Sequence, residues 1–480
     1  MKILHYNWID PQDRAGRGGG VRLYMQALVA QQRRAGWQVT TLASGLGHDL
    51  RARPARWRKC RDGHYEIVNS GCLAPSHADF ATQAQVQHAP TEAAFLDFLD
   101  RTGPYDVVHV HSLEGLPAQC LAFVDDHRTT RLVMSLHNYH PFCPQVNLWW
   151  QERASCRDFA GGKNCTTCLP VTPHPGALRL IYGVETRLAR LGMGPGSAAH
   201  KLVWQPLMRA GWRILRHFRR NRPGGVVPTG EPGNLAAQFR MRRERMVALI
   251  NTHCTAVLAV SDRTRQLAEG FGVKKARTCY IGTGHAQHWA RSAPRHLPRD
   301  TSPARPLRLA YLGYMRRDKG FGFLLDALET LPPEHAACLH LTIAARRGEA
   351  SMMARMEALR GRLAGLVWHN GYSRDALDAL LTDIDCGIVP PLWEDNLPQV
   401  ALELHARHIP ILTSDRGGAQ ELGGTSALTF RAGDCQDFHA MLARILRGDA
   451  VLDQYWAHAR VPQDMARHAA ELAAIYKGVA

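Results

Sequence analysis

The first forty residues combine two hydrophobic periodicities. Residues 2–8 are a short, mostly apolar run that is typical of a buried strand. A glycine-rich turn follows at 16–20, and apolar side chains then recur at helical spacing until Gly36. Residues 37–43 return to the pattern of a strand. Strand, glycine-rich loop, helix and strand in this order predict the start of a doubly wound α/β domain.

Two further strands are predicted at 106–111 and 132–137, and each ends in a histidine. In open α/β sheets, ligands bind beyond the carboxyl ends of the strands. His111 and His137 are therefore placed where chemistry can occur. For each histidine taken alone, a ring that only hydrogen-bonds within its own loop is an equal alternative.

A second α/β domain is predicted to begin at 307–313. It continues through strands at 339–344 and 386–389 to a helix near 437–447. The segment 294–306 is rich in Pro, Arg and Ser, which favours an interdomain linker. Between about 142 and 250 the α/β pattern is interrupted, and this insert holds four cysteines and many basic residues.

Composition narrows the class of protein. A chain of 480 residues with 45% hydrophobic content fits two domains, and 21% charged residues argue against a disordered chain. The formal charge of +17 suits nucleic acid, an anionic membrane or a phosphate-bearing substrate. With no signal-peptide pattern and no apolar run near the ~18 residues of a spanning helix, we expect a cytoplasmic protein, or one on the inner face of a membrane. In that reducing compartment, cysteines are expected as thiols or metal ligands.

The richest chemical segment runs from Pro390 to Glu403. A strand ends, a polar loop follows, and a helix is predicted to start near Pro398, with Asp395 before it and Glu403 inside it. The N-terminus of a helix offers unpaired N–H groups that suit a diphosphate, and a neighbouring carboxylate can accept hydrogen bonds from sugar or ribose hydroxyls. A capped surface helix with a solvated glutamate is an equal alternative for this segment alone.

Two other segments repeat the strand, glycine and polar-residue arrangement. In the first, from Gly313 to Phe321, Arg316 and Lys319 can direct positive charge at a leaving phosphate. Read in isolation, a solvated basic loop is the simpler interpretation of this segment. The second runs from Asp415 to Leu422 and contains a Gly-Gly pair followed by Glu421.

Together, these segments resemble the retaining glycosyltransferases of family 4, which have the GT-B fold. The similar motifs are the N-terminal glycine loop at Gly18, Gly19 and Gly20; the "vS" and "hNG" positions at Ser261 and 280–282; the G…KG loop at 313–320; the E-x7-E pair at Asp395 and Glu403; and the GG-x-x-E turn at 417–421. The resemblance covers nearly the whole chain, and the C-terminal motifs occur in the family's order.

The resemblance implies two doubly wound, Rossmann-like domains that face each other across a cleft. Residues 1–285 would form the acceptor-side domain, with the insert at about 142–250, and residues 300–455 the nucleotide-sugar domain. Residues 456–480, with a last helix at 457–477, would cross back to the first domain. The implied reaction moves a sugar, with retention and without an essential metal, from a nucleotide-sugar donor to a glycan or lipid-linked acceptor. Assembly of a cell-surface polysaccharide or glycolipid is the expected setting.

The resemblance also implies a role for each matched residue. Arg316 and Lys319 would hold the donor diphosphate, next to Gly313 in the same loop. Asp395 would contact the donor sugar and Glu403 the ribose, and His137 would face the transferred sugar. The remaining donor-binding residues would be Asn396 and Leu397 through their backbone N–H groups, Gly18, Gly19 and Gly20 through close approach to the donor phosphate or acceptor, and Glu421.

Three positions depart from the family pattern. Asp395 stands where the family usually has Glu, with Glu394 beside it. Tyr314 replaces an Arg, and Ile281 replaces the Asn before Gly282. These departures keep open a second hypothesis, in which a weakened homologue binds nucleotide sugar or a partner enzyme without turnover.

The insert carries Cys143, Cys156, Cys165 and Cys168, the last two as a C-x2-C pair. A C-x2-C pair is a common half of a zinc site, so a structural zinc is one interpretation. Reduced thiols or a redox-labile pair is the other. A subset of the family is similar here, with cysteines after the same strand, and His137 and His140 are alternative ligands.

Residues 201–222 place apolar side chains on one predicted helical face and arginines on another, with Trp204 and Trp212 nearby. This pattern is typical of a helix on an anionic membrane surface. A helix packed on its own domain with a solvated basic face is an equal alternative. No nucleic-acid-binding module is recognisable, so we do not expect nucleic acid as a partner.

Overall fold

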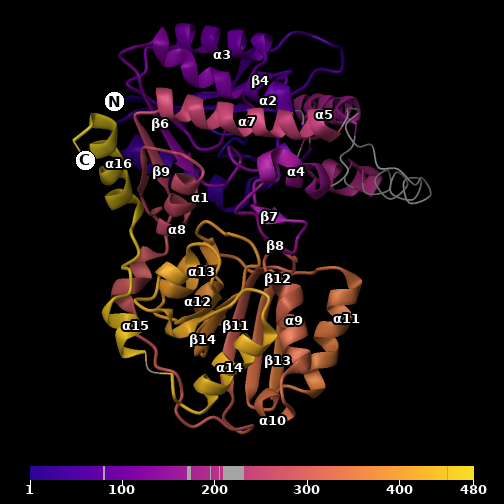
Figure 1. Cartoon of the computed structure of the whole chain (residues 1–480), viewed down its shortest axis with the longest axis vertical. Helices are drawn as coiled ribbons and strands as arrows, with labels where there is room; N and C mark the ends of the chain where they lie inside the picture. The colour runs from indigo at the N-terminus through magenta and orange to yellow at the C-terminus, as the bar shows by residue number, and fades with distance from the viewer. Residues whose placement is uncertain are drawn as a thin grey trace. The chain divides into compact units, whose positions relative to one another are not determined.

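The computed structural model describes residues 1–78, 80, 82–169, 174–194, 196–204, 206–208, 232–450 and 452–479 (Figure 1). Contacts divide the chain into two compact units. Unit 1 comprises Met1–Ala259, Arg265–Cys279 and Ala469–Ala480, and unit 2 comprises Val260–Thr264 and Tyr280–His468. Each unit has its own sheet. The units are interleaved along the chain, whereas the domains expected from the sequence are consecutive, so the expected boundaries stay a prediction.

Unit 1 contains an eight-stranded sheet. Its strand order is β10 (Ala276–Thr278), β9 (Ala256–Ala259), β6 (Arg131–Leu136), β5 (Val107–Val110), β1 (Lys2–Tyr6), β2 (Gln38–Ser44), β4 (His64–Val68) and β3 (Arg56–Arg61). The pairing of β3 with β4 is antiparallel, and the other pairings in this sheet are parallel. β1 lies between β2 and β5, so Ile3 pairs with both Val39 and Val107. The strand order reverses at β1, as in a doubly wound fold.

The strands of unit 1 confirm the apolar runs predicted from the sequence. All four residues of β5 are buried, as are five of the six residues of β6. Burial on both faces explains why these strands are continuously apolar rather than alternating. The helices and 3-10 or π turns before and inside the insert are α1 (Gly19–Arg34), η1 (Ser76–Ala78), α2 (Thr82–Val86), α3 (Ala89–Thr102), η2 (Ala118–Asp125), η3 (Ala160–Gly162), α4 (Lys163–Cys168), α5 (Pro175–Arg190), η4 (His200–Trp204) and α7 (Pro232–His253).

The insert holds a small hairpin, formed by β7 (Trp149–Trp150) and β8 (Ala154–Ser155). Helix α4 follows it and packs against α7. α7 also packs against α2 and η2, so it joins the insert to the rest of unit 1 (Figure 1). The predicted basic helix is described only at 201–204 and 206–208. Its arginines at 209, 213, 216 and 220, with Trp212, lie outside the described residues.

Unit 2 contains a six-stranded parallel sheet. Its strand order is β13 (Gly365–Asn370), β12 (Leu339–Arg346), β11 (Leu307–Tyr314), β14 (Cys386–Val389), β15 (Ile411–Ser414) and β16 (Thr429–Phe430). Counted from its first strand, this is the 3-2-1-4-5-6 order of a Rossmann fold. The order reverses between β11 and β14, the two strands that precede the predicted donor-binding loops.

The helices and 3-10 turns of unit 2 are η5 (Ala286–Arg291), α9 (Phe321–Thr330), α10 (Pro333–Ala336), α11 (Ala350–Ala358), η6 (Leu359–Gly361), α12 (Leu377–Leu380), α13 (Gln399–His405), η7 (Ala419–Glu421), η8 (Ser426–Leu428), α14 (Cys435–Leu446) and α15 (Asp453–Ala457). α9 packs against α11 and α14 (Figure 1). Side chains of α9 such as Phe321, Leu324 and Leu328 join those of the sheet in one buried cluster. α14 begins at the N-cap Asp434, whose carboxylate accepts a hydrogen bond from the N–H of Asp437.

The C-terminal segment corrects one prediction. A single helix at 457–477 is wrong, because α15 ends at Ala457 and α16 (Met465–Lys477) begins eight residues later. Pro462 lies in the gap, and a proline inside a helix removes a hydrogen bond and clashes with the preceding turn. α8 (Asp262–Gly270) and α16 each contain residues of both units. The segment 294–306 is assigned to unit 2, so its role as a linker stays a prediction.

Within the described part of the chain, no helix is both long and apolar enough to span a membrane.

Candidate functional site

The predicted donor-binding loops lie at the point of unit 2 where the strand order reverses. The loop 315–320 follows β11, and the loop 390–398 follows β14, its neighbour in the sheet. The carboxyl ends of adjacent parallel strands lie at one edge of a sheet, and a crevice forms outside them. The fold therefore brings together two motifs that are more than seventy residues apart in sequence.

A direct ion pair joins these two loops. The Nζ atom of Lys319 lies 2.5 Å from Oδ2 of Asp395. The ammonium group also lies 5.0 Å from the centre of the Trp393 ring, a cation–π distance. The side chain of Asp395 is 10% exposed and that of Lys319 28% exposed, so the pair is partly open to solvent. A ligand can reach the ammonium group without unfolding the loops.

Arg316 is not part of this pair. Its guanidinium forms two hydrogen bonds with the carboxylate of Asp318, at 2.9 and 2.8 Å, and its side chain is 64% exposed. An exposed ion pair of this kind contributes little to stability and rearranges easily. In this structure Arg316 is paired with Asp318 rather than with Asp395 or Glu403. Its role toward a diphosphate stays a prediction.

Glycines allow the loops to approach one another closely. A Cβ atom on Gly320, where φ is +75°, would lie 1.7 Å from the carbonyl oxygen of Pro390. A Cβ atom on Gly417, where φ is +71°, would lie 1.8 Å from the carbonyl oxygen of Asp395. Gly418 donates its N–H to that same oxygen at 2.9 Å. The glycines at 320, 417 and 418 thus fix the backbone around Asp395, and no larger residue fits at the first two.

Glu403 occupies a second group of side chains at the C-terminal end of α13. Its Oε2 atom accepts a hydrogen bond from the hydroxyl of Tyr372 at 2.6 Å, and its Oε1 atom lies 3.7 Å from Nε2 of His285. Burial raises the pKa of Glu403, while Tyr372, Arg407 and Arg374 oppose that rise. Burial and the neighbouring arginines lower the pKa of His285 to about 4, so its ring is neutral near pH 7. The contact with His285 is therefore not an ion pair at that pH.

Gly313 lies near the C-terminal end of β11, close to the start of α13. A Cβ atom on Gly313, where φ is +120°, would lie 3.5 Å from Cγ1 of Val400 in α13. The next residue, Tyr314, is 50% exposed and close enough to influence the ionisation of Tyr372. The end of β11 is therefore near the helix that carries Glu403, while Lys319, in the loop after β11, reaches Asp395.

Two acids near the motif are held by other groups. The carboxylate of Glu394 is fully buried and receives two hydrogen bonds from Arg263, at 2.9 and 2.6 Å, and one from the N–H of Gly417. The carboxylate of Glu421 accepts the N–H groups of Asp262 and Arg263 at the start of α8 and the hydroxyl of Tyr280. These contacts hold the start of α8 against the loops that carry Glu394 and Glu421. The carboxylate of Glu394 is therefore bound to Arg263, and Asp395 is the acid that contacts Lys319.

Asn396 and Leu397 lie in the same buried turn, directly before α13. The side chain of Asn396 donates to Oγ1 of Thr264 at 3.3 Å, and Leu397 is 7% exposed. The predicted use of their backbone N–H groups is not tested by these contacts. Like the other proposed roles toward a donor, it stays a prediction.

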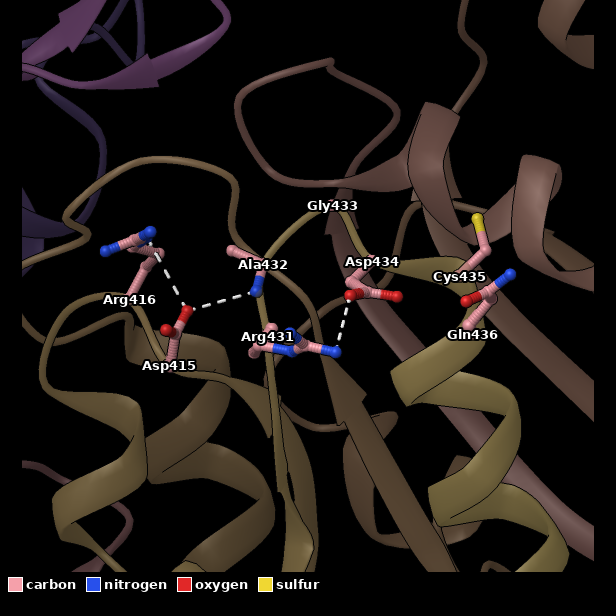
Figure 2. A pocket seen from close by; sticks show the side chains of 8 residues that line it. All are labelled: Asp415, Arg416, Arg431, Ala432, Gly433, Asp434, Cys435 and Gln436. Atoms are coloured by element: carbon pink, nitrogen blue, oxygen red, sulfur yellow. Dashed lines mark hydrogen bonds and ion pairs between the residues drawn. The ribbon is translucent and has the colours of Figure 1, made fainter.

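A shallow pocket of about 540 Å³ lies beyond the carboxyl ends of β15 and β16 (Figure 2). Arg416 and Asp415 come from the loop after β15, while Arg431 and Asp434 come from the loop that leads into α14. Figure 2 shows that Asp415 joins the two loops. Its carboxylate contacts Arg416 in its own loop and accepts a hydrogen bond from the N–H of Ala432 in the other loop, at 3.0 Å. The pocket extends the charged edge of unit 2. Sequence reasoning missed Arg431 because one arginine after a two-residue strand carries no motif.

Sequence reasoning also missed the residues that support the acids. Arg263 follows Ser261, the "vS" position, and Tyr372 follows β13. Neither position is specified by a motif. Each acts through a contact between residues distant in sequence: Arg263 and Glu394 are 131 positions apart, and Tyr372 and Glu403 are 31 positions apart.

In unit 1, the glycine loop leads into α1. Gly18 is the N-cap of this helix with φ of 77°, and a Cβ atom there would lie 2.5 Å from Cγ2 of Ile9. Gly19 has φ of +50°, and a Cβ atom there would have no neighbour within 4 Å among the described residues. Gly20 continues the first turn. The loop after β1 and the histidines after β5 and β6 lie at the carboxyl edge of this sheet.

His137 belongs to a chain of buried hydrogen bonds. Its Nε2 atom lies 3.1 Å from Nδ1 of His111, whose Nε2 atom lies 2.9 Å from Nδ1 of His5. Nε2 of His5 in turn lies 2.7 Å from Oε1 of Gln32. Tyr24 packs against the His137 ring with centroids 5.0 Å apart. The network holds the His137 ring in place at the end of β6.

The geometry of this network bears on metal binding. One nitrogen each of His5, His109 and His111 lies within 4.8 Å of the other two, as in a metal site. However, the ring nitrogens are already in hydrogen bonds: His109 contacts the hydroxyls of Tyr476 and Ser135, and the other two rings contact Gln32, His137 and one another. A hydrogen-bonded cluster therefore accounts for these three histidines.

Comparison with known proteins agrees with this geometry. Residues 306–448 match the family model described as "Glycosyl transferases group 1". Residues 19–163 match the model described as "Glycosyl transferase 4-like domain". No curated protein matches the sequence.

Solved structures share the fold over the whole chain at low sequence identity. HepE of Anabaena, crystallised with UDP, has 14% identity and a TM-score of 0.55, covering 100% of both chains. Sucrose-phosphate synthase of Thermosynechococcus elongatus has 13% identity and a TM-score of 0.55, covering 100% of this chain and 99% of its own. A UDP-forming α,α-trehalose-phosphate synthase of Burkholderia xenovorans has 13% identity and a TM-score of 0.54, covering 100% of both chains.

The two family models match separate segments in the order that a two-domain transferase requires, and the Rossmann strand order in both units agrees with the shared fold. The chain belongs to the family-4 type of glycosyltransferases, with the GT-B fold of two Rossmann-like domains.

Proposed function

We propose that this glycosyltransferase moves a sugar from a UDP-sugar donor to a hydroxyl group of a glycan or lipid-linked acceptor, with retention of the anomeric configuration. The observation that carries the proposal is the ion pair between Lys319 and Asp395 at the reversal point of the unit 2 sheet. It places a cation and a carboxylate side by side where a Rossmann-like fold binds its ligand.

The nature of the donor is supported by the solved structures that share the fold. HepE of Anabaena was crystallised with UDP and with UDP-glucose, and the trehalose-phosphate synthase is described as UDP-forming. In this chain, the buried carboxylate of Glu403 suits two vicinal ribose hydroxyls, each of which needs an acceptor. A nucleoside diphosphate sugar meets both requirements, with the ribose at Glu403 and the diphosphate at Lys319.

The charges assign a part of the reaction to each residue. Negative charge grows on the β-phosphate as the bond to the sugar breaks, and the ammonium group of Lys319 stabilises that charge. Among the described residues, the guanidinium of Arg316 is paired with Asp318 alone, and in this exposed position it can turn toward the same phosphate. Asp395, once Lys319 engages the diphosphate, accepts hydrogen bonds from sugar hydroxyls. These parts need no metal ion.

Retention follows if the acceptor attacks from the side of the departing phosphate. The phosphate oxygen then takes the proton of the acceptor hydroxyl as the new glycosidic bond forms, and UDP leaves. His137, fixed by its hydrogen bond to His111, is the proposed contact for the transferred sugar from unit 1. Gly18, Gly19 and Gly20 would allow close approach of the phosphate or acceptor to the start of α1.

The proposal for the acceptor names a class of molecule and a location at the membrane surface. The net charge of +17 and the arginines of 201–222 favour an acceptor at an anionic membrane surface, such as a lipid-linked sugar or a growing surface polysaccharide. Binding to anionic liposomes that is lost when the arginines at 209, 213, 216 and 220 become glutamine would support this setting. Unchanged binding would remove it.

The decisive experiment measures donor binding and donor cleavage together. UDP-, GDP-, ADP- and dTDP-glucose are compared for their effect on thermal unfolding, since a ligand at about 100 times its Kd adds roughly 2.7 kcal/mol of stability. Release of UDP from UDP-glucose, with water in place of the acceptor, reports chemistry. We expect UDP-glucose to stabilise the protein, and K319A to abolish UDP release. K59A, at an exposed lysine paired with Asp62, is the matched control.

The two hypotheses from the sequence give different results. Stabilisation by UDP-glucose without UDP release, in the presence of membrane extracts that supply acceptors, would identify a binding protein without turnover. Failure of every nucleotide sugar to stabilise the protein would contradict both.

A further inference from the structure

The four cysteines of the insert surround one small cavity in unit 1. Cys143, Cys156, Cys165 and Cys168 line it, together with Trp149 and Arg243. Its volume of about 20 Å³ is enough for one water-sized particle. The cysteines lie up to 25 positions apart in sequence, yet the cavity contains no thiol from outside the insert among its described lining residues.

Two short elements carry three of these thiols, and Cys143 lies in the segment between β6 and β7. Cys156 follows the hairpin strand β8 directly, and its N–H donates to the carbonyl oxygen of Leu148 on the other side of the hairpin. Cys165 and Cys168 are three residues apart on α4, so they lie on one face of that helix. A hairpin and a single helical turn are the elements that commonly present a tetrahedral cysteine set.

The hairpin and α4 have few other stabilising interactions, because they are short and pack on a small hydrophobic cluster. The strands β7 and β8 have two residues each, and α4 has six. Among the described residues, the hydrophobic cluster at this place contains three buried members, namely Cys165, Leu235 and Phe239. A hairpin or helix of this length is not stable alone, and small modules with so small a core usually need a disulfide or a metal. The cysteines are all free thiols.

Two buried arginines adjoin the thiols. Arg242 is 1% exposed and donates to two neutral groups, the amide oxygen of Gln85 and the carbonyl oxygen of His140. Arg243 is 8% exposed, donates to the carbonyl oxygen of Phe142 and stacks on the ring of Phe159 at 3.5 Å. Among the described residues, no carboxylate forms an ion pair with either. Buried charge without a partner is costly, so a negative group is expected nearby.

The thiols and the arginines are close in space, since Arg243 lines the same cavity as the four cysteines. The sulfur of Cys168 accepts the side-chain N–H of Gln145 at 3.1 Å and the backbone N–H of Gln151 at 3.2 Å. Such N–H···S contacts commonly support metal-bound thiolates.

We propose that Cys143, Cys156, Cys165 and Cys168 bind one Zn²⁺ ion in a tetrahedral, structural site. Binding releases four thiol protons and leaves a zinc tetrathiolate with a net charge of −2, which Arg242 and Arg243 balance. In the described part of the chain, the groups of three ligand atoms within 4.8 Å of one another do not include these sulfurs. The cysteine side chains therefore rotate inward to reach the Zn–S distance of about 2.3 Å.

The test measures metal content of the full-length protein purified from zinc-supplemented medium. We expect about one zinc per chain, and a strong loss of zinc in C156S and in C168S. C60S, at an exposed cysteine outside the insert, is the matched control and should keep its zinc. Because a cysteine variant can misfold, wild-type protein is also refolded with Co²⁺, where a four-thiolate site gives the intense visible absorption of tetrahedral cobalt.

A third variant tests the charge balance without removing a ligand. R243Q should keep the four thiols but bind zinc about 10- to 100-fold more weakly in competition with a chromogenic chelator. Wild-type protein that contains no zinc and has four freely reactive insert thiols would overturn the proposal. A Cys165–Cys168 disulfide, or zinc retained equally in C156S and C168S, would overturn it as well. None of these readouts depends on sugar transfer.

Discussion

Lys319 and Asp395 form an ion pair of 2.5 Å across two loops that follow adjacent strands of unit 2. The pair has two separable consequences. It stabilises the loops, because a mostly buried carboxylate has a positive partner, and it holds the cation where a diphosphate would bind. Stability and donor affinity can therefore be separated by substitutions at these two positions.

The first prediction uses that separation. K319M should destabilise the protein by about 1–3 kcal/mol, because Asp395 loses its partner in a mostly buried position. K319M/D395N should recover most of that loss, since two neutral side chains of similar size replace the pair. Donor affinity should fall at least tenfold in both variants. Urea unfolding and calorimetric titration with UDP-glucose give the two quantities, and recovered affinity in the double variant would refute the role of Lys319.

The second prediction concerns the pH dependence of donor binding. Burial raises the pKa of Glu403, so its carboxylate takes up a proton at a higher pH than an ordinary glutamate. A protonated Glu403 accepts fewer hydrogen bonds from a ribose. We therefore expect the affinity for UDP to fall as pH decreases through this raised pKa. E403Q, which cannot titrate, should bind UDP more weakly and lack that part of the pH dependence.

Tyr372 provides the matched variant for this prediction. Its hydroxyl donates to the Glu403 carboxylate and so lowers the pKa of that group. Y372F should raise the pKa further and move the loss of UDP affinity to higher pH. Titrations with UDP between pH 5 and pH 8 measure the midpoint. A midpoint that is the same in Y372F and wild type would show that Glu403 does not control the profile.

The third prediction tests the close approach of the Gly-Gly turn to Asp395. G417A places a Cβ atom 1.8 Å from the Asp395 carbonyl oxygen, in a backbone conformation with φ of +71°. The strain alone costs about 1–2 kcal/mol, and the loop that carries Asp395 must also move. We expect a loss of stability together with at least a tenfold loss of UDP-glucose affinity.

Gly36 is the control for G417A. Its φ of +80° is similar, but among the described residues no atom beyond Gly36 and its two chain neighbours lies within 4 Å of the position that a Cβ atom would take. G36A should therefore show only the conformational cost of about 1 kcal/mol and bind UDP-glucose normally. Equal losses of affinity in the two variants would mean that general destabilisation, rather than the position of Asp395, explains the effect.

The sequence predicts the strands and the motif loops well because local patterns determine them. The apolar run 307–313 and the strand β11 agree to within one residue, and the glycine loops follow their strands as expected. Local patterns do not determine which side chains each acid contacts. Glu394 and Asp395 are adjacent, and only the long-range partners Arg263 and Lys319 show which of them faces the donor loop. Sequence patterns alone do not predict which side chain will contact a residue that lies more than seventy positions away.

The interrupted C-terminal helix illustrates a second limit. The resemblance implies a last helix at 457–477, but Pro462 prevents a continuous helix over that range, and α16 begins only at Met465. The resemblance therefore predicted the end of this helix correctly and its start wrongly. The same limit applies to the insert, where cysteine spacing suggested a metal site but could not show that two buried arginines adjoin it.

The last prediction concerns stability in acid. Burial lowers the pKa of His5 to about 4, because its ring has no exposure, while the hydrogen bond to Gln32 opposes that change. In the unfolded chain, the same histidine takes up a proton near pH 6.5. Between pH 6.5 and 4, the unfolded state therefore binds a proton that the folded state does not, and stability falls as pH decreases. For His5 alone, the loss from pH 7 to pH 5 is roughly 2 kcal/mol.

Urea unfolding at pH 7 and pH 5 measures this loss. H5Q should be less stable than wild type at pH 7, because it disturbs the hydrogen-bonded chain that ends at His137, but it should lose less stability on acidification. H458Q, at an exposed position of unit 2, should keep the wild-type difference between the two pH values. If H5Q and wild type lose the same free energy of unfolding, His5 is protonated in the folded state. The hydrogen-bonded chain from Gln32 to His137 would then carry a charge, which would contradict the burial of a neutral His5 ring that this prediction assumes.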